Sequence, residues 1–82
     1  MTADLTEGSR ALLISLIEDA PNWLGTPIFG YNVGIGKEAK GHLLHLKKQG
    51  YVETQLDEYG DAIVHFLPKG VAVAASLDME VN

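Results

Sequence analysis

Apolar residues recur three and four positions apart over residues 5–20, a spacing that predicts an amphipathic α-helix. Thr6 stands near the start of this run and suits the N-cap, and Pro21 follows the run and marks its end. Because the apolar stripe is wide, this helix should lie across the core. The stripe consists of Leu5, Ser9, Leu12, Leu13, Leu16, Ile17 and Ala20.

Residues 35–50 show the same period and predict another long helix, with Gln49-Gly50 as its C-terminal cap. At about 100° per residue, Ala39, Leu43 and Leu46 share one narrow arc, which should be buried. The opposite face is basic and includes one leucine. We define this basic face as Lys37, Lys40, Gly41, Leu44, His45 and Lys48.

The stretch between these two helices is interrupted by glycine and proline. Thr26 is a candidate N-cap, Pro27 suits the first position of a helix, and Gly34 can end one. The pattern therefore predicts a short helix over residues 27–33.

A β-hairpin is predicted after the basic helix. Residues 51–56 alternate as a strand does, residues 57–61 contain turn formers, and residues 62–67 are rich in β-branched and aromatic side chains. Pro68 ends the return strand, and the Ala/Val-rich residues 71–77 predict a short terminal helix.

Length and composition indicate one folded domain over residues 1–82, with an ordered core at about 5–77. The absence of cysteine excludes disulfides and thiolate zinc sites. No apolar run approaches the ~20 residues of a membrane span, and the first residues do not resemble a signal peptide, so we expect a cytoplasmic protein without membrane contact. Burial is expected for Leu12, Leu13, Leu16, Ile17, Trp23, Ala39, Leu43, Leu46, Val52, Val64 and Phe66.

Charge is distributed unevenly along the chain. The net charge is −5, yet residues 37–48 contain four of the six Lys and Arg residues and only one acid, Glu38, which makes this segment +3. The remainder of the chain is therefore −8. A basic helix on an acidic body leaves one face able to approach phosphates.

The predicted order of elements resembles the winged helix-turn-helix domain of bacterial regulators such as the MarR, ArsR and PadR families. Two stretches carry the resemblance. Residues 42–53 (HLLHLKKQGYVE) are similar to the end of a recognition helix and the first wing strand, and residues 63–70 (IVHFLPKG) to the second wing strand and the following helix. The resemblance implies an α+β fold of three helices with a β-hairpin wing and a short C-terminal helix.

This resemblance and the basic face together predict a small transcriptional regulator that binds double-stranded DNA sequence-selectively. The lysines of the basic face would contact phosphates or guanine, and His45 would reach a base or phosphate. Leu44 would touch a thymine methyl group, and Gly41 would allow close approach of the backbone. Because such a surface makes few phosphate contacts, a homodimer or a protein partner is expected.

A protein-binding function is the alternative. The predicted turn contains Asp57, Glu58, Tyr59 and Asp61, and residues 53–61 include no cation, so DNA should repel this loop. An acidic loop with an aromatic tip, or an exposed Leu44, suits a protein partner. The alternative is thus an acidic winged-helix module that acts as an adaptor or inhibitor.

Catalytic motifs are missing from the sequence, so no enzymatic activity, catalytic residue or cofactor is predicted. There is no Gly-x-Ser-x-Gly sequence, and residues 34–38 lack the glycine spacing and the Ser or Thr of a phosphate loop. His42, His45 and His65 are candidate nitrogen ligands, but no pattern brings His65 to the other two, so no metal site is predicted.

Overall fold

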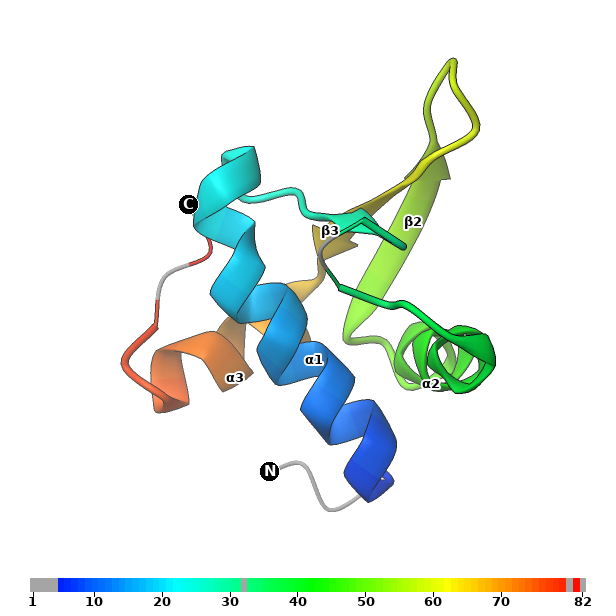
Figure 1. Cartoon of the computed structure of the whole chain (residues 1–82). Coiled ribbons are helices and arrows are strands. Elements are labelled where there is room, and N and C mark those ends of the chain that lie inside the picture. The colour runs from blue at the N-terminus through cyan, green and yellow to red at the C-terminus, as the bar shows by residue number, and fades with distance from the viewer. Residues whose placement is uncertain (1–4, 32, 80, 82) are drawn as a thin grey trace.

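The computed structural model of the chain describes residues 5–31, 33–79 and 81 (Figure 1). The elements are α1 (Glu7–Asp19), a 3₁₀ turn (Ala20–Trp23), β1 (Ile28–Phe29), α2 (Lys37–Lys48), β2 (Val52–Leu56), β3 (Ala62–Phe66) and α3 (Pro68–Ser76). The fold is therefore α+β. Among the described residues, no helix has the length and apolar character needed to cross a membrane.

The first helix begins and ends as its sequence predicts. Thr6 has an extended backbone conformation and its Oγ1 accepts a hydrogen bond from the Ser9 amide at 3.2 Å, which confirms the predicted N-cap. The same hydroxyl donates to Ser9 Oγ at 2.9 Å, and this bond satisfies a side chain that is fully buried. The α-helical part ends before Pro21, which lies in the 3₁₀ turn that follows.

The predicted helix over residues 27–33 is wrong. Ile28 and Phe29 form β1 instead, and they pair antiparallel with Ile63 and Ala62 of β3. The local cap signals are overridden because the extended backbone of β1 gains hydrogen bonds from a strand far away in sequence. The chain then turns, and the Gly30 amide donates to the Val33 carbonyl at 2.6 Å. Residue 32, also in the predicted helix, lies outside the described residues.

The end of α2 is closed by a Schellman motif at Gly50, so the predicted C-cap is confirmed. Gly50 has a φ of +81°, in the left-handed region that favours glycine. Its amide donates to the Lys47 carbonyl at 3.2 Å, and the Tyr51 amide donates to the Leu46 carbonyl at 3.0 Å. These two bonds satisfy the last carbonyls of α2 and direct the chain into β2.

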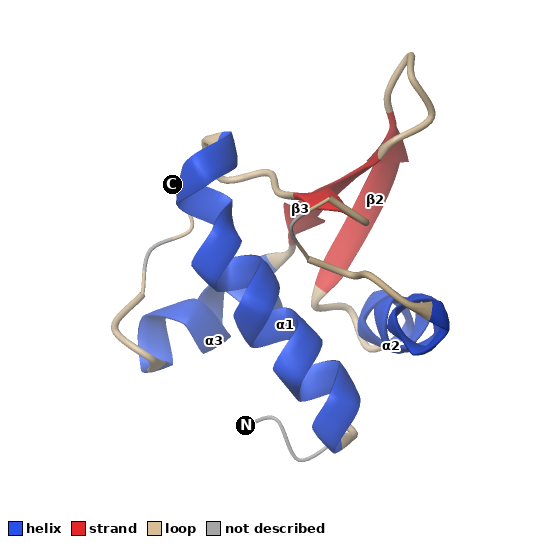
Figure 2. Cartoon of the chain, in the orientation of Figure 1, coloured by secondary structure: helices blue, strands red, loops and turns tan. Residues whose placement is uncertain are grey.

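The predicted hairpin is confirmed, and β1 extends it to a three-stranded antiparallel sheet with the order β1-β3-β2 (Figure 2). In the hairpin register, Val52 pairs with Phe66 and Leu56 pairs with Ala62. Figure 1 shows the turn of the hairpin extending beyond the helices.

The third helix, α3, starts at Pro68, three residues earlier than predicted. Pro68 fits there because the first turn of a helix needs no amide hydrogen from that position. Buried Gly70 lies against the Tyr51 carbonyl, and a Cβ at this position would collide with that oxygen. Beyond α3, the Met79 amide donates to the Ala74 carbonyl at 2.9 Å, and Met79 and Val81 pack against the core.

The core joins all three helices to the inner face of the sheet. Most of the side chains predicted to be buried are buried, whereas Trp23, Ala39 and Phe66 are half-buried. Tyr51 is also fully enclosed, and Lys69 Nζ lies 4.4 Å from the centre of its ring. The core cluster consists of Leu12, Leu13, Leu16, Ile17, Leu43, Leu46, Tyr51, Val52, Val64, Val73 and Ala74.

Candidate nucleic-acid interface

The packing of α2 turns its basic face toward solvent. Leu43 and Leu46 are buried against the core, with exposed fractions of 8% and 0%. Since these two leucines hold one face of α2 against the core, the side chains on the opposite face of the helix must point toward solvent. Lys37, Lys40 and Lys48 are all exposed.

No ion pair between described residues neutralises the positive charge of this face. Within the described residues, Lys37, Lys40 and Lys48 form neither an ion pair nor a side-chain hydrogen bond. Glu38 is the one acid in α2, and it is exposed about 100° around the helix axis from Lys37 and about 80° from Lys48. The three ammonium groups are therefore available to an anionic ligand.

Leu44 and Gly41 lie among these lysines. The Leu44 side chain is 57% exposed, on the face of α2 that points away from the core. Gly41 is exposed, and a Cβ at this position would meet no atom of the described residues within 4 Å. Packing within the chain therefore does not require glycine at position 41, although glycine destabilises a helix interior by about 1 kcal/mol relative to alanine.

The N-terminus of α2 also faces outward without a side-chain cap. Gly36 is its N-cap residue, has a φ of +109° and contributes no side-chain hydrogen bond to the first turn. Exposed Lys37 is the first residue of the helix. The positive end of the helix dipole therefore adds to the charge of the lysines on the same surface.

The three histidines are less accessible than the lysines. His42 and His45 are half-buried on α2, and His65 is half-buried on β3. His65 alternates with buried Val64, but its Nε2 atom is enclosed and has no hydrogen-bond partner among the described residues. No group of three or more His, Asp or Glu side chains in the described part of the chain is arranged to hold a metal ion.

At the tip of the hairpin, one of the predicted acidic residues holds the turn together. Asp57 Oδ1 accepts hydrogen bonds from the amides of Tyr59 at 2.8 Å and Asp61 at 2.9 Å. Such a turn fixes the direction of its neighbours. Glu58 is exposed and the Tyr59 ring is 82% exposed, so both project into solvent.

The basic face and the acidic turn are separate surfaces. The turn follows the five residues of β2, so it lies about 17 Å along the strand from the point where α2 meets the sheet. Figure 1 shows the turn and α2 at different ends of the molecule. The two sets of predicted site residues are thus not brought together, and a ligand of α2 need not meet the acids of the turn.

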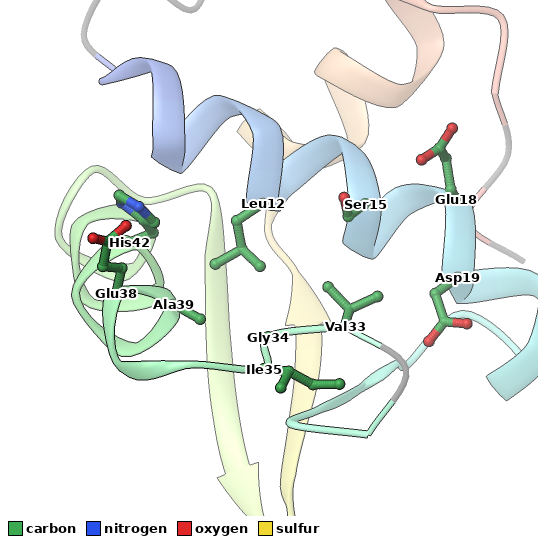
Figure 3. Close-up of a pocket in the computed structure, with 10 residues that line it drawn as sticks. All are labelled: Leu12, Ser15, Glu18, Asp19, Val33, Gly34, Ile35, Glu38, Ala39 and His42. Atoms are coloured by element: carbon green, nitrogen blue, oxygen red, sulfur yellow. The ribbon is translucent and has the colours of Figure 1, made fainter.

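One surface was not predicted from the sequence, namely a groove of about 600 Å³ between α1, α2 and the loop before α2 (Figure 3). Its residues come from three separate segments, so helical periodicity within one segment gives no signal for it.

Comparisons of the chain with protein-family models, curated proteins and solved structures give no match. The function of the chain is therefore inferred from the geometry and charge of its own surfaces.

Proposed function

We propose that the chain is a small winged-helix transcriptional regulator that binds duplex DNA through α2, with β1 and the following loop in place of a second helix. The observation that carries the proposal is the exposed basic face, on which Lys37, Lys40 and Lys48 surround Leu44 and have no carboxylate partner in the described part of the chain. A concentration of positive charge on one helix of an acidic domain is typical of a surface that meets phosphates.

The dimensions of α2 suit the major groove. Its 12 residues span about 18 Å, and the groove is about 12 Å wide, so two to three turns can enter it. In this arrangement Lys37 and Lys48, near the two ends, contact phosphates on either side of the groove. Leu44 and Gly41, between them, face the base edges, where leucine contacts a thymine methyl group and glycine allows close approach.

The acidic turn limits how much DNA one protomer can contact. Glu58 and Asp61 lie at the tip of the hairpin and should avoid phosphates. A single protomer therefore makes few phosphate contacts and binds weakly, so we propose that the chain acts as a homodimer or with a protein partner. Sedimentation velocity tests this, because a monomer that binds DNA tightly at all concentrations would contradict it.

Salt dependence of DNA binding tests the main proposal. With three lysine–phosphate contacts, the slope of log K against log salt is about −2.7, so affinity falls roughly 40-fold between ~50 and ~200 mM salt. Fluorescence anisotropy of a mixed-sequence duplex measures this slope. The double variant Lys40→Gln/Lys48→Gln should lower its magnitude by about 1.8.

A matched control separates the basic face from general charge effects. Arg10→Gln removes one positive charge from an exposed position of α1 and should preserve the slope, whereas Lys40→Gln or Lys48→Gln alone should lower its magnitude by about 0.9. Equal losses in Arg10→Gln and in the single lysine variants would refute the assignment to α2. If the wild type does not bind even at ~50 mM salt, DNA binding itself is refuted.

The second candidate function is protein binding by the tip of the hairpin. The observation that favours it is the 82% exposed ring of Tyr59 on a turn that Asp57 holds in place, next to Leu56, which is 70% exposed. Exposed aromatic and aliphatic side chains on an ordered turn are common interface anchors. This function would be favoured if the chain binds a protein partner, if Tyr59→Ser abolishes that binding, and if the chain does not bind DNA.

A further inference from the structure

The groove between α1 and α2 combines an apolar floor with polar and acidic side chains around it. Leu12 of α1, Ala39 of α2 and Val33 of the intervening loop line it, and Ile35 forms one wall (Figure 3). The Ile35 side chain is 78% exposed although it stands beside these apolar groups. An exposed isoleucine next to an apolar hollow is a typical feature of a protein-binding surface.

Two close contacts fix the shape of the groove. At one end, the His42 ring lies against Gly8 so closely that a Cβ on Gly8 would collide with it. In the loop, Gly34 has a φ of +88° and lies against the Phe29 ring, which leaves no room for a side chain. The walls are therefore held by packing and are in place before any ligand binds.

At the other end, buried Asp19 ties the groove to the 3₁₀ turn. Its Oδ2 accepts a hydrogen bond from Trp23 Nε1 at 2.8 Å, and its Oδ1 accepts one from Asn22 Nδ2 at 3.1 Å. The Asp19 carboxylate thus has internal partners, and its role is to position this end of the groove.

The rim of the groove is negatively charged. Glu18 rises from α1 and Glu38 from α2, and both are exposed. The described residues that line the groove include no Lys or Arg, so together with Asp19 their formal charge is −3 when histidine is neutral. A ligand that is apolar in the middle and cationic on its flanks complements this surface.

We propose that this groove binds a basic amphipathic helix of a partner protein. The walls are two helices and a loop and offer no open strand edge, so an occupant must bind by packing its side chains. The stretch of α1 from Leu12 to Asp19 is about 10 Å long, which matches about two turns of helix. Apolar residues at i, i+3, i+4 and i+7 of the partner cover the floor, and its Lys or Arg residues reach Glu18 and Glu38.

The groove and the basic face can be occupied together. Ala39 and His42 lie about 120° or more around the axis of α2 from Lys37, Leu44 and Lys48. Glu38, at the rim of the groove, lies about 80–120° from the same three residues. A helix in the groove therefore leaves the lysines exposed. The proposal consequently does not depend on DNA binding, and it gives the chain a way to attach a partner to DNA or to act on that partner alone.

Binding of a designed peptide tests the proposal. The probe is a fluorescent amphipathic helical peptide with leucine on one face and lysine on both flanks, and its comparison is the same peptide with glutamate in place of lysine. The chain should bind the lysine peptide and not the glutamate peptide. Glu18→Lys/Glu38→Lys should weaken binding about tenfold or more, because two attractions become repulsions.

Matched variants make the result specific to the groove. Glu53→Lys/Glu58→Lys makes the same charge change at exposed glutamates elsewhere, and it should weaken binding much less. Ile35→Ser should weaken binding about tenfold. Leu24→Ser, at a side chain that is 89% exposed and does not line the groove, should have no effect. All four positions are exposed, so the variants should fold, which circular dichroism can check.

Three results would overturn the proposal. The first is equal binding of the lysine and glutamate peptides, and the second is equal weakening by the groove variants and their controls. The third is a dimer of the chain that Ile35→Ser dissociates, because a second copy would then be the occupant. Loss of DNA binding in Lys40→Gln/Lys48→Gln with peptide binding intact would leave this proposal standing.

Discussion

Alanine at Gly41 and alanine at Gly70 should change the stability of the chain in opposite directions, although both glycines lie within helices. Gly41 is exposed in the middle of α2, and within the described parts of the chain a Cβ there would meet nothing within 4 Å. Gly70 is buried near the start of α3, and a Cβ there would collide with the Tyr51 carbonyl oxygen. The two substitutions are chemically identical and differ only in their surroundings.

The expected magnitudes follow from those surroundings. Gly41→Ala should stabilise by about 0.5–1 kcal/mol, since glycine in a helix interior loses more backbone entropy on folding than alanine. In Gly70→Ala the entropic stabilisation is smaller, because position 70 lies in the first turn of α3. The new methyl group must also displace a backbone oxygen, and overpacking of this kind typically costs about 1–3 kcal/mol. In a domain of this size, 1 kcal/mol corresponds to about 4–8 °C in melting temperature.

Thermal unfolding followed by circular dichroism measures both effects on the same protein. The melting temperature should rise by a few degrees in Gly41→Ala and fall in Gly70→Ala. A fall in Gly41→Ala would mean that the outer face of α2 is covered, and a rise in Gly70→Ala would mean that α3 does not pack on Tyr51. Weaker DNA binding by the stabilised Gly41→Ala variant would support close approach of the backbone to DNA at this position.

Further predictions concern hydrogen bonds of single side chains. Trp23→Phe removes the donor to buried Asp19 and should cost about 1–3 kcal/mol, and an unchanged urea midpoint would contradict the bond. Asp57→Ala should destabilise the hairpin by about 1 kcal/mol, whereas Asp57→Asn keeps an acceptor and should cost less despite the same loss of charge. Equal destabilisation by the two variants would mean that Asp57 acts through its charge and not through its hydrogen bonds in the turn. Thr6→Ala should cost about 1 kcal/mol and Thr6→Ser little, as guanidinium denaturation can measure.

Sequence reasoning succeeded where the determinants of structure are local. The period of apolar residues predicts α1 and α2, Gly50 predicts the end of α2, and alternation predicts β2 and β3. It failed at residues 27–33, because the pairing of β1 with β3 depends on residues more than thirty positions away. Local cap signals could not reveal that partner.

In the candidate site, too, some features could be predicted from the sequence and others could not. The exposure of the lysines on α2 is predictable, because it follows from the burial of Leu43 and Leu46 on the opposite face. The groove is not predictable, since it requires the relative placement of α1, α2 and the loop. Buried Asp19 was missed although its partner Trp23 is only four residues away, because Trp23 lies beyond the end of α1 and charged residues are normally expected at the surface.

The most direct test of the main proposal is a nuclear magnetic resonance titration of the ¹⁵N-labelled chain with a short DNA duplex at low salt. The proposal predicts that the largest amide shifts fall on α2, at Lys37, Lys40, Gly41, Leu44 and Lys48, with small shifts at residues 57–61. Shifts confined to the hairpin tip, or none at millimolar duplex, would contradict binding of DNA by α2.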